Sequence, residues 1–168
     1  MALRWGLQAA TWTLLAGWFG SFSFFAIIIA PTAFQVLPSQ AAAGSLVAPI
    51  LAALHTYGML AGVALATLGA TLRRGWLAVA LPLVLAAVCA VSEFGITRAI
   101  KEVEPHAFGE QYEQEPAERF AQLHEFSMGL FAVVQFGTLG LIFLHSQPPP
   151  LASPARGPKK PNKFAESP

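Results

Sequence analysis

The chain has 168 residues, of which 55% are hydrophobic and only 11% are charged, with a formal net charge of +1. A soluble domain carries roughly 25% charged residues, so most of this surface is expected to face a lipid bilayer, which is the partner that the composition predicts. The small net charge argues against nucleic acid as a partner, and the single cysteine, Cys89, excludes an intrachain disulfide and a zinc site built from cysteines.

Four apolar segments follow one another along the chain, and each is predicted to form a transmembrane helix. The predicted bounds are 7–30, 46–72, 76–98 and 118–145. Each segment has at least the ~20 residues that a helix needs to cross the hydrocarbon, where only a helix satisfies its own backbone hydrogen bonds. We therefore predict an all-α integral membrane four-helix bundle over 1–146. A disordered, proline-rich and basic cytoplasmic tail is predicted over 147–168.

Basic residues gather at one end of the predicted bundle. Four crossings put both termini on one side of the membrane, together with the short turn between the second and third helices. That side carries Arg4, Arg73, Arg74, Arg156, Lys159, Lys160 and Lys163. The other side has three basic residues among six glutamates between positions 98 and 119. By the positive-inside rule, both termini are predicted to be cytoplasmic, and the protein is predicted to be a multi-pass protein of the cell inner (plasma) membrane.

The first two helices carry signals for their ends and their packing. Pro31 is predicted to end the first helix, because proline interrupts the backbone hydrogen bonds. The second helix has a small residue at every fourth position, at Gly58, Gly62, Ala66 and Ala70. Such a seam lets another helix approach closely. We expect the seam to pack inside the bundle, and a contact between two copies in a homo-oligomer is the alternative.

Ionisable side chains interrupt three of the apolar segments at similar depth. They are His55, Glu93, Arg98, His124 and Glu125, with Ser127 beside them. At ~1.5 Å of rise per residue, they are predicted to lie in the outer half of the bilayer, within roughly 10 Å of one another in height. A charge at mid-bilayer costs at least ~2.5–3.5 kcal/mol, so Glu93 is expected to be paired, protonated or near water. His124 and Glu125 point about 100° apart, so they cannot both face the bundle centre.

Three interpretations of this polar cluster are open. In the first, Glu93 pairs with an arginine, or hydrogen-bonds to His55 or His124, and only fixes the packing of the helices. In the second, the cluster transports or handles a cation, a proton or a metal complex, because histidine and carboxylate suit both proton transfer and metal binding. In the third, His55 and His124 are axial ligands of a haem. No single cofactor is predicted, so a metal ion and a haem both stay open.

The chain contains no nucleophile elbow, phosphate-binding loop, dinucleotide-binding fingerprint or HExxH zinc motif. We therefore expect no enzymatic activity. Partner binding through the acidic loop or through the small-residue seam is a further alternative.

Several segments together resemble a known family. They are WFGSFSFFAIIIAPTAF at 18–34, an AAAG turn at 41–44, VSEFGITRAI at the end of the third helix and FAQLHEFSMG at the start of the fourth. This combination resembles the transmembrane-protein-205-like family, a domain of unknown function found in bacteria and eukaryotes. The resemblance implies a four-helix integral membrane protein. Animal relatives are connected with tolerance to platinum-type drugs, which implies transport or trafficking of metal complexes. The polar positions that match are Glu93, Arg98, His124 and Ser127, with the pair Ala30 and Pro31.

Overall fold

The computed structural model of the chain describes residues 1–108 and 114–147, and its regular structure there is helical throughout. In chain order the elements are α1 (Ala2–Phe24), the π-helical turn η1 (Phe25–Ile29), α2 (Ala30–Val36), α3 (Gln40–Thr71), α4 (Leu77–Val91), the π-helical turn η2 (Ser92–Ile96), α5 (Thr97–Phe108) and α6 (Gln114–Ser146). Joined end to end, they give four helices in the described residues that are long and apolar enough to cross a membrane, at Ala2–Val36, Gln40–Thr71, Leu77–Ala107 and Gln114–Ser146. The prediction of an all-α membrane bundle with four long helices is confirmed.

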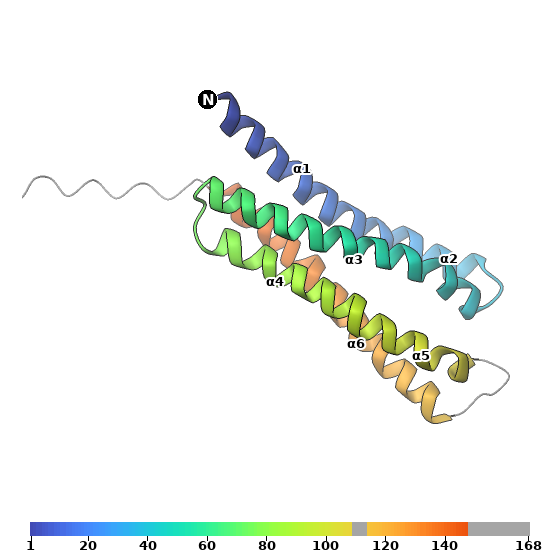
Figure 1. Ribbon diagram of the computed structural model, residues 1–168. Coiled ribbons are helices and arrows are strands. Elements are labelled where there is room, and N and C mark those ends of the chain that lie inside the picture. The colour runs from blue at the N-terminus through green and yellow to red at the C-terminus, as the bar shows by residue number, and fades with distance from the viewer. Residues whose placement is uncertain (109–113, 148–168) are drawn as a thin grey trace, which may run out of the picture.

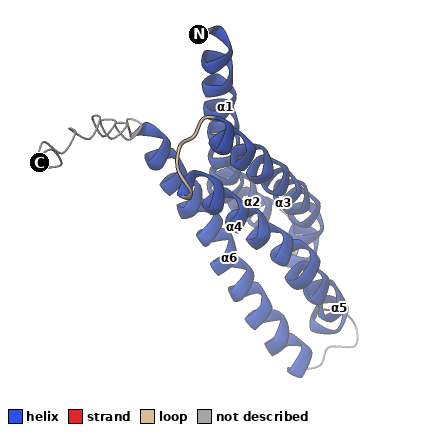
Figure 2. Cartoon of the chain, turned by 60° about the vertical axis from the view of Figure 1, so that its left-hand side comes forward, coloured by secondary structure: helices blue, strands red, loops and turns tan. Residues whose placement is uncertain are grey.

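The four long helices run up and down beside one another (Figure 1). The N-terminus, the turn between α3 and α4, and the end of α6 lie at the same end of the bundle. The first turns of α1 stand apart from the other helices (Figures 1 and 2), and they leave the side chains of Leu3 and Trp5 largely exposed. Both described ends are therefore on one side, as four crossings require. The cytoplasmic location of that side stays a prediction.

The first membrane helix does not end at Pro31, so that prediction is wrong. The chain stays helical through η1 and α2 as far as Val36, with Pro31 at the second position of α2. A proline ring inside a helix collides with the carbonyl four residues earlier, which here belongs to Ile27. Ile27 lies in η1, where the wider π-helical turn displaces that carbonyl from its α-helical position. The π-helical turn thus lets the helix continue past the proline.

The second membrane helix begins at Gln40, earlier than the predicted position 46. Ser39 caps it, because its side chain accepts a hydrogen bond from the backbone N–H of Ala42 at 3.1 Å. The AAAG segment at 41–44 therefore lies inside the helix and is not a turn. Alanine has the highest intrinsic helix propensity, so three alanines in the first turn after a serine cap favour helix over turn.

The third and fourth membrane helices also extend beyond the predicted bounds of 76–98 and 118–145. The third continues through η2 and α5 to Phe108, and the fourth begins at Gln114. Helix α5 packs along α6 and also reaches the start of α3, where a Cβ on Gly44 would lie 3.6 Å from Glu104 Oε1. This packing supports helical turns that are too polar to lie in hydrocarbon. Residues 109–113, and the predicted tail of 147–168 from residue 148 onward, lie outside the described residues.

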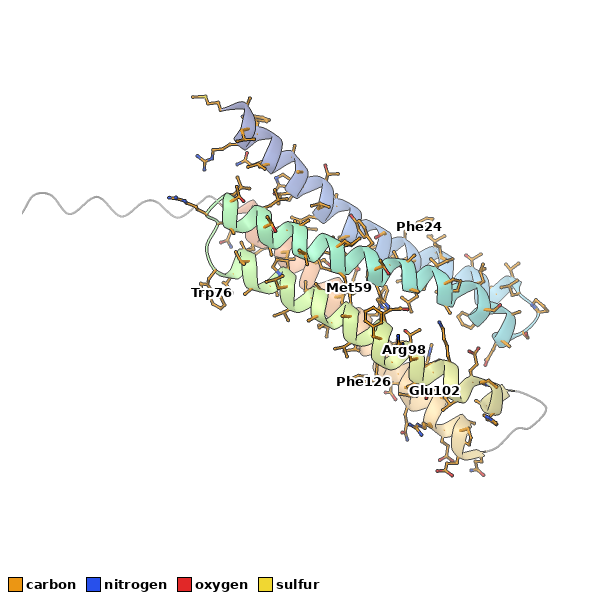
Figure 3. The ribbon with its side chains drawn as sticks, in the orientation of Figure 1. Phe24, Met59, Trp76, Arg98, Glu102 and Phe126 are labelled. Carbon is orange, nitrogen blue, oxygen red and sulfur yellow. The ribbon has the colours of Figure 1, made fainter. Side chains whose placement is uncertain are left out.

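A well-packed apolar core fills the space between the helices. Its buried members are Leu15, Trp18, Phe22, Ala61, Leu65, Leu85, Cys89, Val134 and Leu141. Many large apolar side chains are instead exposed on the outside, and Figure 3 shows Phe24, Trp76 and Phe126 pointing away from the bundle. An apolar exterior around an apolar core is the arrangement expected of a protein that lipid surrounds.

The small-residue seam of α3 packs against α4 of the same chain. Gly58, Gly62 and Ala66 are buried there, whereas Ala70 is exposed. A repeat of four residues drifts by about 40° per step around a helix of 3.6 residues per turn, so Ala70 has turned about 120° from Gly58. Gly69, 11 residues after Gly58 and about 20° from it, takes the place of Ala70 in the contact. A Cβ on Gly69 would lie 2.5 Å from the carbonyl oxygen of Ala78.

The side chain of Arg74 caps the C-terminal end of α6. Its Nη1 atom donates to the carbonyl oxygens of Gln147 at 3.1 Å and His145 at 3.4 Å. These carbonyls have no partner within the helix, and a cation at this end also complements the helix dipole.

Replacing Arg74 with glutamine is expected to loosen the last turn of α6 by about 0.5–1 kcal/mol, because one charge and its carbonyl contacts are lost. Amide hydrogen exchange of the last turn should then be about twofold to fivefold faster. The neighbouring Arg73→Gln variant is the control, since Arg73 is exposed at this turn. Equal exchange in the two variants would contradict a capping role for Arg74.

Candidate functional site

A histidine and a glutamate form a pair inside the bundle. His55 lies on α3 and Glu93 on η2, and the atoms His55 Nδ1 and Glu93 Oε2 are 3.1 Å apart. The side chain of His55 is 2% exposed and that of Glu93 is 17% exposed. Ionisable groups at such a position are costly unless they are paired, so each side chain makes the burial of the other less unfavourable.

The π-helical turn η2 positions the glutamate. The backbone N–H of Thr97 and its hydroxyl both donate to the carbonyl oxygen of Ser92, five residues earlier. Such turns are rare, they widen the helix locally, and they occur frequently at functional sites. Glu93 is the second residue of this turn, so the turn sets the direction in which its carboxylate leaves the helix.

An aromatic ring of α1 lies beside the histidine of the pair, and a ring of α6 stacks on it. The ring of Phe22 on α1 lies 6.4 Å from the ring of His55, measured between centroids. Phe22 in turn stacks on Phe131 of α6 at 5.0 Å. His55 is thus covered by apolar groups, and a hydrogen bond in apolar surroundings is stronger than one in water.

Arg98 does not join the pair. It is exposed, and its guanidinium carbon lies 5.7 Å from the centre of the Phe94 ring, in a cation–π contact. Figure 3 shows Arg98 on α5, one turn before Glu102. Glu93 lies in η2 and contacts His55, whereas Arg98 lies in α5 and contacts the exposed ring of Phe94.

The predicted site residues of α6 also lie away from the pair. His124 is exposed, and its ring stacks on that of Phe120, with 6.0 Å between centroids and 5° between planes. Glu125 is exposed and Ser127 is half-buried. Of the six residues predicted to form one cluster, the structure brings only His55 and Glu93 into direct contact.

The structure also reveals buried polar groups that the sequence does not single out. His145 is 5% exposed, and its Nδ1 atom lies 2.9 Å from the carbonyl oxygen of Leu141. Gln135 joins α6 to α1, because its side-chain Nε2 donates to the hydroxyl of Ser23. Ser92, directly before Glu93, is 2% exposed. Their sequence surroundings are apolar, but so are those of many lipid-facing residues in this chain, so burial could not be read from the pattern.

The pair supplies two side chains of the types that coordinate metal ions. Within residues 1–108 and 114–147, no group of three or more histidine, cysteine, aspartate or glutamate side chains is placed to hold a metal ion. Structural and catalytic metal sites usually have three or more protein ligands. The two histidines considered for a haem also differ in position, since His55 is buried against Glu93 and His124 is exposed.

One family model matches this chain. It describes a domain of unknown function, DUF4149, and it covers residues 13–108. The matched segment runs from α1 to α5 and contains both His55 and Glu93, whereas His124, Glu125 and Ser127 lie beyond it. The match supports a domain of unknown function and gives no support to the transmembrane-protein-205-like family specifically. No curated protein and no solved structure matches the chain.

Proposed function

We propose that this chain, which belongs to the DUF4149 family of unknown function, is an integral membrane protein that binds and passes on a proton at the pair of His55 and Glu93. The single observation that carries the proposal is the contact of 3.1 Å between the buried side chain of His55 on α3 and the half-buried carboxylate of Glu93 in the π-helical turn η2. The proton would be exchanged with the outer side of the membrane. The basic residues Arg4, Arg73 and Arg74, at the end that holds both termini, support a cytoplasmic location of that end.

The chemistry of the pair supports proton transfer. Histidine changes charge near neutral pH, and a carboxylate beside it can take the proton or stabilise the imidazolium that forms. Intramembrane histidine and glutamate side chains commonly serve as proton relays in pumps and transporters. The hydrogen bond already joins the two atoms between which a proton would move.

Transport of a metal cation or metal complex is one alternative to proton transfer. The resemblance to the transmembrane-protein-205-like family favours it, and the exposed His124 and Glu125 on α6 would supply further ligands only if α6 turned. A structural role, in which the pair only holds α3 against η2, is the other alternative, since polar side chains join helices in membranes at about 0.6–2 kcal/mol per contact.

Proton flux through reconstituted protein tests the proposal. Liposomes with an internal pH dye and a potassium diffusion potential should acidify or alkalinise faster with the protein than without it. Elemental analysis of protein purified without added metal distinguishes metal transport from proton transfer. A near-stoichiometric metal that is lost in a double variant, Glu93→Gln with His124→Ala, would support it. Flux equal to that of protein-free liposomes would overturn the proton proposal.

A further inference from the structure

Three buried polar atoms lie close to the pair of His55 and Glu93. They are Trp18 Nε1, Ser92 Oγ and Gln135 Oε1, and none has a hydrogen-bond partner within the described part of the chain. They come from three elements, α1, η2 and α6. Buried polar groups in proteins are nearly always hydrogen-bonded to protein or to ordered water, so each of these atoms needs a partner from outside the described residues.

The surroundings of Gly58 place Trp18 in the layer of the bundle next to the pair. A Cβ on Gly58 would lie 3.1 Å from Trp18 Nε1 and 2.7 Å from Cys89 Sγ. Gly58 is one helical turn beyond His55 on α3, and Cys89 is one turn before Glu93 on α4. The indole N–H therefore lies in the layer next to the pair, on the side toward the termini. Ser92 connects that layer to Glu93, its neighbour in sequence.

Gln135 reaches the same level from α6. It lies one turn after Phe131, whose ring stacks on Phe22, and Phe22 lies against His55. Its amide nitrogen is taken up by Ser23 of α1. The amide oxygen is therefore left as an acceptor in the interior, about one turn from the pair.

We propose that this layer binds internal water. The three orphaned groups are an N–H donor, a hydroxyl that both donates and accepts, and a carbonyl acceptor, which matches the hydrogen bonds that water makes to two to four polar partners. We place this water beside η2, because water inserts where the α-helical hydrogen-bond ladder is broken. The water lies between the pair and the end that carries the termini. Its role as the next proton acceptor rests on the proposed function, whereas its presence does not.

Nuclear magnetic resonance detects such water directly. In perdeuterated protein in micelles, the Trp18 Nε1 proton should give a cross-peak to water in rotating-frame spectra, where direct contact and chemical exchange differ in sign. Ser92→Ala should lose this peak. Ser21→Ala is the matched control, since the Ser21 hydroxyl already donates to the carbonyl oxygen of Trp18 at 3.2 Å.

The thermal midpoint gives a second readout on the same variants. If Ser92 binds water, Ser92→Ala loses a hydrogen bond and melts at a lower temperature than wild type. If the layer is dry, the variant removes an unsatisfied hydroxyl and melts at the same or a higher temperature. A missing cross-peak in wild type, or an unchanged peak together with an unchanged midpoint in Ser92→Ala, would overturn the water site. Absence of proton flux with the cross-peak present would overturn the proposed function alone.

Discussion

Gly62→Ala is expected to destabilise the protein by about 2–3 kcal/mol, although alanine is the better helix former. A Cβ at this position would lie 2.6 Å from the carbonyl oxygen of Pro82 and 2.7 Å from the Cβ of Ala86. Neither atom belongs to a flexible side chain that could rotate away. Because α3 and α4 make the most extensive helix contact in the bundle, a shift of either helix would disturb the whole interface. Reversible unfolding in detergent measures the loss.

Gly140→Ala is the matched control for this substitution. It also lies in a membrane helix, but a Cβ there would meet no atom within 4 Å. This variant should be as stable as wild type, or more stable by up to about 1 kcal/mol from helix propensity. The loss in Gly62→Ala should not depend on protein concentration, because the atoms that it meets belong to the same chain. Equal stability of the two variants would show that α3 and α4 are not packed as closely as the structure has them.

The four membrane helices could be predicted because each long apolar run has only one way to satisfy its backbone in lipid. Their ends could not, because the residues beyond the apolar runs are governed by contacts. Pro31 predicts the end of the first helix, yet the π-helical turn η1 accommodates the proline and the helix continues to Val36. The polar turns after Arg98 read as a loop, yet they are helical because α5 packs along α6.

The pairing of His55 and Glu93 could be predicted from the sequence, because their positions along the helices put both side chains at the same depth. The sequence could not predict that Arg98 and His124 lie away from this pair. Sequence spacing gives the rotation of a side chain about its own helix, but not which neighbouring helix covers it. The three orphaned atoms of Trp18, Ser92 and Gln135 carry no sequence signal either, because tryptophan, serine and glutamine also occur at lipid-facing and loop positions. Only the packed bundle shows that they are buried together.

Glu93→Gln is expected to lower the proton flux of reconstituted protein by roughly 100-fold, the size of effect that loss of a positioned acid–base group produces. The amide keeps the shape of the side chain and can still hydrogen-bond to His55 Nδ1, but it cannot take up a proton. The free energy of unfolding should therefore change by no more than about 1 kcal/mol. Glu102→Gln, the same substitution at an exposed carboxylate of α5, should leave both quantities unchanged.

The two readouts of Glu93→Gln together separate proton transfer from helix packing. If the pair only holds α3 against η2, folded Glu93→Gln protein behaves like wild type in the flux assay, whatever the change in its stability. If the pair carries a proton, folded variant protein is present in normal amount and is inactive. His55→Gln provides the reciprocal test, because it removes the other titratable group of the same contact of 3.1 Å. A double variant that is no slower than either single variant would show that the two side chains act as one unit in the transfer, whereas additive losses would mean that they act separately. Flux that survives in both single variants would place the proton path elsewhere and leave the pair with a structural role.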